Sequence, residues 1–244
     1  MTARFAFAVL QAGVGIGLAH AQVSADAPEL SFPAVRSDLF VSLTTLAAPR
    51  EAKKAYQRAS REAGRKKPDF VKAARELEKA LTIYPGYAAA WYFLGGTQLV
   101  RNDVEGARQA FQNAIAADPR FPYPYLPLAD IEFRAEHFAD AARLTETAVR
   151  LEPRLVEAHY MNALAYSVLG HRDRARQSIR AVLAEDGDRR YPSVYLLLGD
   201  LSAAEGNFAS AAEECRRLLE MKPSSPAADL ARKRLAEWKA QGKL

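Results

Sequence analysis

The chain has 244 residues, 49% of them hydrophobic and 26% charged, which is typical of a folded protein and argues against a largely disordered one. Its formal net charge of +5 is too small to indicate nucleic-acid binding by itself, and a single cysteine excludes an internal disulfide framework. Ala, Leu, Arg, Glu and Lys dominate the sequence, and because these residues favour helices, we expect an all-α protein.

Residues 1–21 have the pattern of a secretory signal peptide. Arg4 supplies the positive start, Phe5 to Leu18 is an apolar stretch too short for a membrane span, and Ala19-His20-Ala21 fits the small-x-small cleavage rule. The alternative is a buried N-terminal helix, which the glycines of "VGIG" disfavour. We therefore expect an exported protein, periplasmic or secreted, whose mature chain starts at Gln22 and has no transmembrane segment.

Residues 22–50 differ from the rest of the chain, with several prolines and few helix formers. Leu39, Val41 and Leu43 alternate with polar residues, which is typical of a short extended segment, although Phe40 breaks the alternation. We expect an extended or partly ordered segment that lies along the following domain or reaches a partner.

A period of 34 residues follows. It separates three prolines, Pro85, Pro119 and Pro153. It also separates four alanines, and a fifth follows after 36 residues: Ala73, Ala107, Ala141, Ala175 and Ala211.

The second copy shows which repeat this is. It carries Trp91, Leu94, Gly95, Ala107, Phe111, Ala114 and Pro119, with Gln98 in place of a tyrosine. This pattern resembles the tetratricopeptide repeat, a helix-turn-helix unit. The resemblance implies an all-α, right-handed superhelical solenoid with a C-terminal capping helix at 226–244. We assign residues 51–225 to five repeats, at 53–87, 88–121, 122–155, 156–191 and 192–225.

The fourth repeat is the most degenerate, because His159, Asn162 and Gly187 replace the usual Trp, Leu and Pro. Asp69, Asp103 and Asn207 stand where second helices begin, and we expect them to cap the free N–H groups there.

Enzyme signatures are lacking: the sequence has no G-x-S-x-G, P-loop, H-E-x-x-H or C-x-x-C motif. His137 and His171 fall at the same repeat position, at the start of a second helix, which favours a turn or capping role over metal binding. Cys215 takes a core position and is expected to be a buried, inert thiol. We therefore expect no catalytic residues, no metal and no cofactor.

The family resemblance implies that certain first-helix positions line a concave groove. They form an apolar and phenolic stripe suited to a protein or peptide segment. The alternative is that some of them pack between adjacent repeats. The groove residues are Tyr92, Leu99, Tyr123, Leu126, Asp130, Phe133, Tyr160, Leu164, Leu196 and Asp200, with Arg134 and Glu157 beside them.

A basic cluster marks the first repeat. Such a cluster can attract an anionic polymer or membrane surface, and the alternative is a solvated face on an end repeat. Few aromatic residues interleave with it, which argues against single-stranded nucleic acid. The candidate residues are Lys53, Lys54, Arg58, Arg61, Arg65, Lys66 and Lys67, preceded by Arg50.

These patterns favour a non-enzymatic interaction scaffold that binds a partner segment in its groove, in bacterial envelope assembly. The alternative function is binding of an anionic envelope component through the basic first repeat. No nucleic-acid partner is expected.

Overall fold

The computed structural model describes residues 42–185 and 190–244, so the expected signal peptide and most of the segment 22–50 lie outside the described residues. The described chain falls into two compact units, of which one ends at Pro153 and the other begins at Arg154. Every regular element in the described ranges is a helix, and none of these helices has the length and apolar character needed to cross a bilayer.

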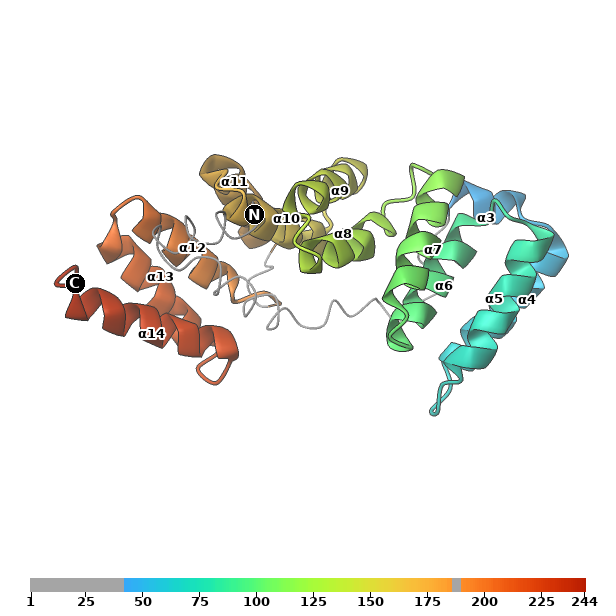
Figure 1. Cartoon of the computed structure of the whole chain (residues 1–244), viewed down its shortest axis with the longest axis horizontal. Helices are drawn as coiled ribbons and strands as arrows, with labels where there is room; N and C mark the ends of the chain where they lie inside the picture. Colours follow the sequence, from blue (N-terminus) through green and yellow to red (C-terminus); the bar gives the residue numbers. More distant parts are fainter. Residues whose placement is uncertain (1–41, 186–189) are drawn as a thin grey trace, which may run out of the picture. The chain divides into compact units, whose positions relative to one another are not determined.

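The unit that ends at Pro153 is built from three helical hairpins and one short helix (Figure 1). Within each hairpin the two helices pack along their length: α4 with α5, α6 with α7, and α8 with α9. The elements are α3 (Leu43–Ala47), α4 (Arg50–Ala63), α5 (Phe70–Ile83), α6 (Ala88–Val100), α7 (Val104–Ala117), α8 (Tyr125–Arg134) and α9 (Phe138–Leu151).

The unit that begins at Arg154 has two further hairpins and a final helix. Helix α10 pairs with α11, α12 pairs with α13, and α14 packs against α13. The elements are α10 (Val156–Val168), α11 (Arg172–Ala184), α12 (Val194–Ala204), α13 (Phe208–Met221) and α14 (Pro226–Ala240).

The expected fold class, an all-α solenoid of helix-turn-helix repeats, is confirmed. The local signals that set the helix ends also act as expected, because three capping side chains accept hydrogen bonds from backbone N–H groups. Asp69 accepts from Lys72 at 2.8 Å, Asp103 accepts from Gly106 at 3.0 Å, and Asn207 accepts from Ser210 at 3.1 Å. The prolines follow the second helices by two residues, where they prevent a longer helix.

The close packing within a hairpin depends on small residues at the crossing point. A Cβ added to Gly95 in α6 would lie 2.5 Å from the ring of Phe111 in α7, and that ring is fully buried. Ala107 and Ala114, one turn on either side of Phe111, are also fully buried. The alanines and glycine of the repeat therefore let the two backbones approach, and the Phe111 ring fills the space above Gly95.

The segment 22–50, expected to be extended or partly ordered, is described only from residue 42 onward. Leu43–Ala47 is a short helix, because the Ser42 hydroxyl caps it by accepting from the Thr44 N–H at 3.2 Å. Of the alternating residues, those up to Val41 lie outside the described ranges, whereas the Ser42 and Thr44 hydroxyls accept hydrogen bonds from the Thr44 and Ala88 N–H groups.

The last helix closes the second unit. Ser225 caps α14 by accepting from the Ala228 N–H at 3.1 Å, and Pro226 occupies its first turn. Trp238 packs edge-on against Phe208, and Arg234 forms an ion pair with Asp200 of α12 at 3.2 Å. These contacts cover the end of the last hairpin.

Candidate partner-binding surface

One aromatic contact recurs along the first helices of the hairpins and determines which of their side chains are exposed to a binding partner. A tyrosine in a first helix packs against an aromatic residue just before the next first helix. The ring centroids are 5.2 Å apart for Tyr56 and Tyr87, 5.7 Å for Tyr92 and Phe121, and 4.5 Å for Tyr160 and Tyr191. This repeated contact joins consecutive hairpins within each unit.

Tyr92 and Tyr160 are therefore core residues, and their assignment to the groove is wrong. Tyr92 is 6% exposed, and burial raises the pKa of its hydroxyl well above the usual range. Tyr160 is fully buried, stacks on Tyr191 and hydrogen-bonds with the Ser193 hydroxyl at 2.7 Å. Replacing either ring by Ala would remove core packing rather than test a binding surface.

Four further predicted groove residues are buried as well. Leu164 of α10 and Leu196 of α12 are fully buried, on first helices that pack against each other. Phe133 is 5% exposed and packs edge-on against Phe138 at 5.1 Å. Asp200 is 8% exposed because its carboxylate faces the guanidinium of Arg234. Contacts between neighbouring helices thus take up these positions.

Four of the remaining predicted residues are partly exposed in the unit that ends at Pro153: Leu99 on α6, Tyr123 just before α8, and Leu126 and Asp130 on α8. Leu99 and Tyr123 pack with one side against the core cluster that contains Tyr92, Phe111 and Phe121. Leu126 and Asp130 are one turn apart on α8, and Arg134 pairs with Asp130 at 2.8 Å. Glu157, in the other unit, forms an ion pair with Arg190.

Gly96 adds a feature that the sequence reasoning missed. A Cβ built on this partly exposed residue would meet no atom within 4 Å, in contrast to its neighbour Gly95. Gly96 lies one turn from Leu99 on the same face of α6. We call the set Gly96, Leu99, Tyr123, Leu126 and Asp130 the α6–α8 surface.

A pattern in the sequence indicates that the first-helix tyrosines, Tyr92 and Tyr160, are buried. Tyr87, Phe121 and Tyr191 occupy one repeat position, with Leu155 between them in register. An aromatic residue that recurs at the repeat period indicates a structural partner for the first-helix tyrosines. The first-helix tyrosines were predicted to lie in the groove from their own repeat position, without being paired with the series Tyr87, Phe121 and Tyr191.

The basic cluster of the first hairpin is divided between paired and unpaired charges. Three of its seven members are neutralised within the hairpin, by Lys54–Glu51 at 3.1 Å, Arg58–Glu76 at 2.7 Å and Arg65–Glu62 at 2.9 Å. The hydrogen bonds from Lys79 and from Arg58 hold the pKa of Glu76 below its usual value.

The other four members meet backbone or solvent. Lys53 donates to the Leu46 carbonyl at 2.9 Å and Arg61 to the Gln57 carbonyl at 3.4 Å. Lys66 and Lys67 are exposed in the turn after α4. The outward charge is therefore smaller than the residue count indicates.

A group of possible metal ligands lies at the α8–α9 turn. Ligand atoms of Glu132, His137 and Asp140 come within 4.8 Å of one another. The Glu132 carboxylate, however, pairs with Arg108 and with the His137 Nδ1 at 2.8 Å, and Asp140 pairs with Arg143. A cation there would have to compete with two guanidinium groups, so the arrangement is better described as an ion-pair network.

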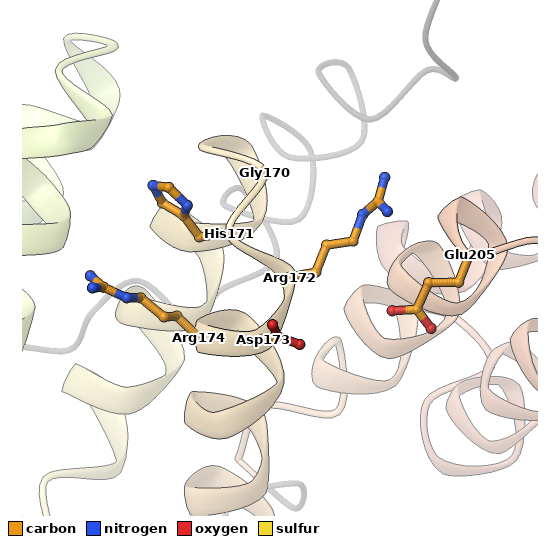
Figure 2. Close-up of a pocket in the computed structure, with 6 residues that line it drawn as sticks. All are labelled: Gly170, His171, Arg172, Asp173, Arg174 and Glu205. Carbon is orange, nitrogen blue, oxygen red and sulfur yellow. The ribbon is translucent and has the colours of Figure 1, made fainter.

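An open depression lies at the α10–α11 turn (Figure 2). Arg172 extends from α11 toward the helix end that carries Glu205, whereas His171 and Arg174 lie on the other side of the turn. Glu205 already pairs with Arg176 at 2.8 Å, and Arg174 donates to the Tyr166 hydroxyl at 2.9 Å. Glu205 and Arg174 therefore already make contacts within the protein and are poor candidates for binding a ligand.

The remaining candidates have structural roles. Cys215 is fully buried, and burial raises the pKa of its thiol to about 12, which suppresses the reactive thiolate. His137 and His171 hold the N-cap positions of α9 and α11, but neither side chain makes a capping hydrogen bond. They are turn residues, and the capping alternative is wrong for both.

Consecutive helical hairpins, joined within each unit by one repeated aromatic contact, define the chain as a helical repeat protein of the solenoid class. Sequence models of the tetratricopeptide repeat match residues 65–126 and 160–226, which together make up more than half of the chain. The chain belongs to the tetratricopeptide repeat family.

Solved structures of similar fold include YrrB, with a TM-score of 0.65 at 20% identity, covering 78% of this chain and 97% of YrrB. Residues from 41 to the end of MamA from Desulfovibrio magneticus RS-1 give a TM-score of 0.61 at 18% identity, covering 72% and 98%. At such identities the likeness shows the fold alone.

A curated relative is the Protein CTR9 homolog of Arabidopsis thaliana, 29% identical over 139 residues. The match covers 57% of this chain but spans only 13% of that protein.

Proposed function

We propose that the chain is a non-catalytic scaffold that binds a segment of a partner protein on the α6–α8 surface. Proteins of the tetratricopeptide repeat family are generally protein-interaction scaffolds. The observations that carry the proposal are the partial exposure of Leu99, Tyr123 and Leu126 and the open space at Gly96, one turn from Leu99.

The chemistry of this surface favours an apolar or amphipathic segment. Its leucines and the Tyr123 ring offer apolar area on helices that are already ordered by the core, so binding costs little conformational entropy. Asp130 adds one acidic group at the edge, shared with Arg134. YrrB, described as a tetratricopeptide repeat protein with an unusual peptide-binding site, supports this use of the fold by analogy.

Binding is tested by variants that change the surface and spare the core. Proteins that copurify with the chain from its own host would be identified, and the affinity of the retained segment measured by titration. Leu126→Asp and Gly96→Arg should each lower that affinity by at least about tenfold. Val71→Asp is the matched control, because Val71 is 47% exposed on α5. Unchanged affinity in both surface variants, with circular dichroism unchanged, contradicts the proposal.

We further propose that the scaffold is exported and serves an assembly in the bacterial envelope. The support is the sequence of residues 1–21 alone. Mass spectrometry of the chain from fractionated cells should find Gln22 as the N-terminal residue in a periplasmic or extracellular fraction. A chain that keeps Met1 or residues 2–21 and stays in the cytoplasm would refute export without affecting the binding proposal.

A further inference from the structure

The short helix α3 exposes its apolar side chains to solvent, whereas its polar neighbours face the protein. Its leucines, Leu43 and Leu46, are 64% and 68% exposed and are the most exposed large apolar residues in the described part of the chain. Its polar neighbours face the protein instead, since Ser42 is buried and Thr44 meets the start of α6. A terminal segment stabilised by apolar burial would show the opposite arrangement.

Hydrogen bonds fix α3 in this orientation. The Ser42 hydroxyl donates to the Asp118 carboxylate at 2.6 Å, and the Thr44 hydroxyl accepts from the Ala88 N–H at 3.1 Å. Lys53 donates to the carbonyl of Leu46 at 2.9 Å. A helix of five residues is unstable by itself, so these contacts hold both leucines at the surface.

Helix α4 follows α3 in the chain and carries several cations, of which Lys53 contacts α3. Arg50, Lys54 and Arg61 follow one another by four and seven residues, so they share one face of α4, and Arg65 lies in the turn after this helix. The opposite face, with Ala52, Ala55 and Ala59, is fully buried. Lys54 and Arg65 pair with glutamates, whereas Arg50 and Arg61 are exposed. Lys53 links this helix to α3.

We propose that α3 and the outward face of α4 form a docking site for an anionic lipid surface. Exposed leucines next to lysines and arginines match the two attractions that bring a protein to such a surface, which are shallow apolar insertion and attraction to headgroup phosphates. A soluble polyanion would use the cations but gain nothing from the leucines. The site is separate from the α6–α8 surface and does not depend on the proposed scaffold function.

The contribution of each attraction to the vesicle-binding constant can be estimated. Each lysine or arginine near an anionic membrane contributes roughly fivefold to the binding constant at low salt. Each leucine that leaves water contributes roughly tenfold or more. Loss of both leucines should therefore lower vesicle binding by about a hundredfold, as should loss of three cations.

The experiment measures cosedimentation of the full chain, as isolated from its own host, with vesicles of phosphatidylcholine alone or mixed with phosphatidylglycerol. The leucine variant carries Leu43→Ser and Leu46→Ser, and the charge variant carries Arg50→Gln, Lys53→Gln and Arg61→Gln. The matched control carries Val100→Ser and Val104→Ser, which removes two other apolar side chains that are 60% and 42% exposed.

We expect the parent chain and the control to bind the mixed vesicles, and both test variants to bind them about a hundredfold more weakly. Soluble polyphosphate should distinguish the two variants, because only the charge variant should lose affinity for it. The proposal is overturned if the parent chain does not bind the mixed vesicles. So does a leucine variant that binds them as the parent does, which would assign the cations to a soluble polyanion.

Discussion

Substitution of the adjacent glycines of α6 tests the packing of α6 against α7, which positions α6 in the α6–α8 surface. Gly95→Ala and Gly96→Ala both replace a helical glycine, so each gains about 1 kcal/mol of helix propensity. At Gly95 the new methyl group would lie 2.5 Å from the buried Phe111 ring, whereas at Gly96 it meets nothing within 4 Å. Overpacking of this kind costs about 1–3 kcal/mol.

We therefore expect Gly96→Ala to stabilise the protein by up to about 1 kcal/mol and Gly95→Ala to be neutral or destabilising, with a difference between them of about 1–3 kcal/mol. Urea unfolding followed by circular dichroism measures the difference. Adding Phe111→Leu should make Gly95→Ala less costly, because the smaller side chain leaves room. Equal stabilisation by the two glycine variants would refute the close approach of α6 and α7.

Three further outcomes follow from the buried and paired groups. The Cys215 thiol, with its pKa raised to about 12, should resist thiol reagents at neutral pH until the chain is unfolded, and rapid labelling of the native chain would contradict its burial. Arg234→Ala should destabilise α14 by on the order of 3 kcal/mol, because the buried Asp200 loses a cation; hydrogen exchange of α14 measures this, and unchanged protection would count against the pair. Glu76 has a lowered pKa when folded, so its ionised form stabilises the protein above the unfolded pKa of about 4.3, and this stability is lost as the pH falls through the folded value. Arg58→Gln should therefore reduce stability at neutral pH and make no difference in strong acid, and a loss that is independent of pH would exclude the linkage.

The sequence predicted the repeats because their signals are local and repeated. The 34-residue period, the capping side chains such as Asp103, and the proline after four of the five second helices act within a few residues of chain. Five copies in one register reinforce each other, so the hairpins could be placed without knowledge of the packing between them.

The surface was predicted only in part, because exposure depends on what the neighbouring hairpin contributes. Tyr92 and Leu126 hold the same repeat position, yet Phe121 covers the first and the second stays partly exposed. The helix α3 was missed for a similar reason. Its orientation depends on Asp118 and the start of α6, which are 76 and 44 residues away from their partners in the sequence.

Site-specific photo-crosslinking tests the central claim, that α6 and α8 receive a partner segment, most directly. A photoreactive amino acid at position 96 projects into open space, and one at Gln109 of α7, which is exposed on the second helix, serves as the control. We predict that a partner from the native host crosslinks to position 96 and not to position 109. Crosslinks of equal yield at both positions, or at position 109 alone, would contradict the account.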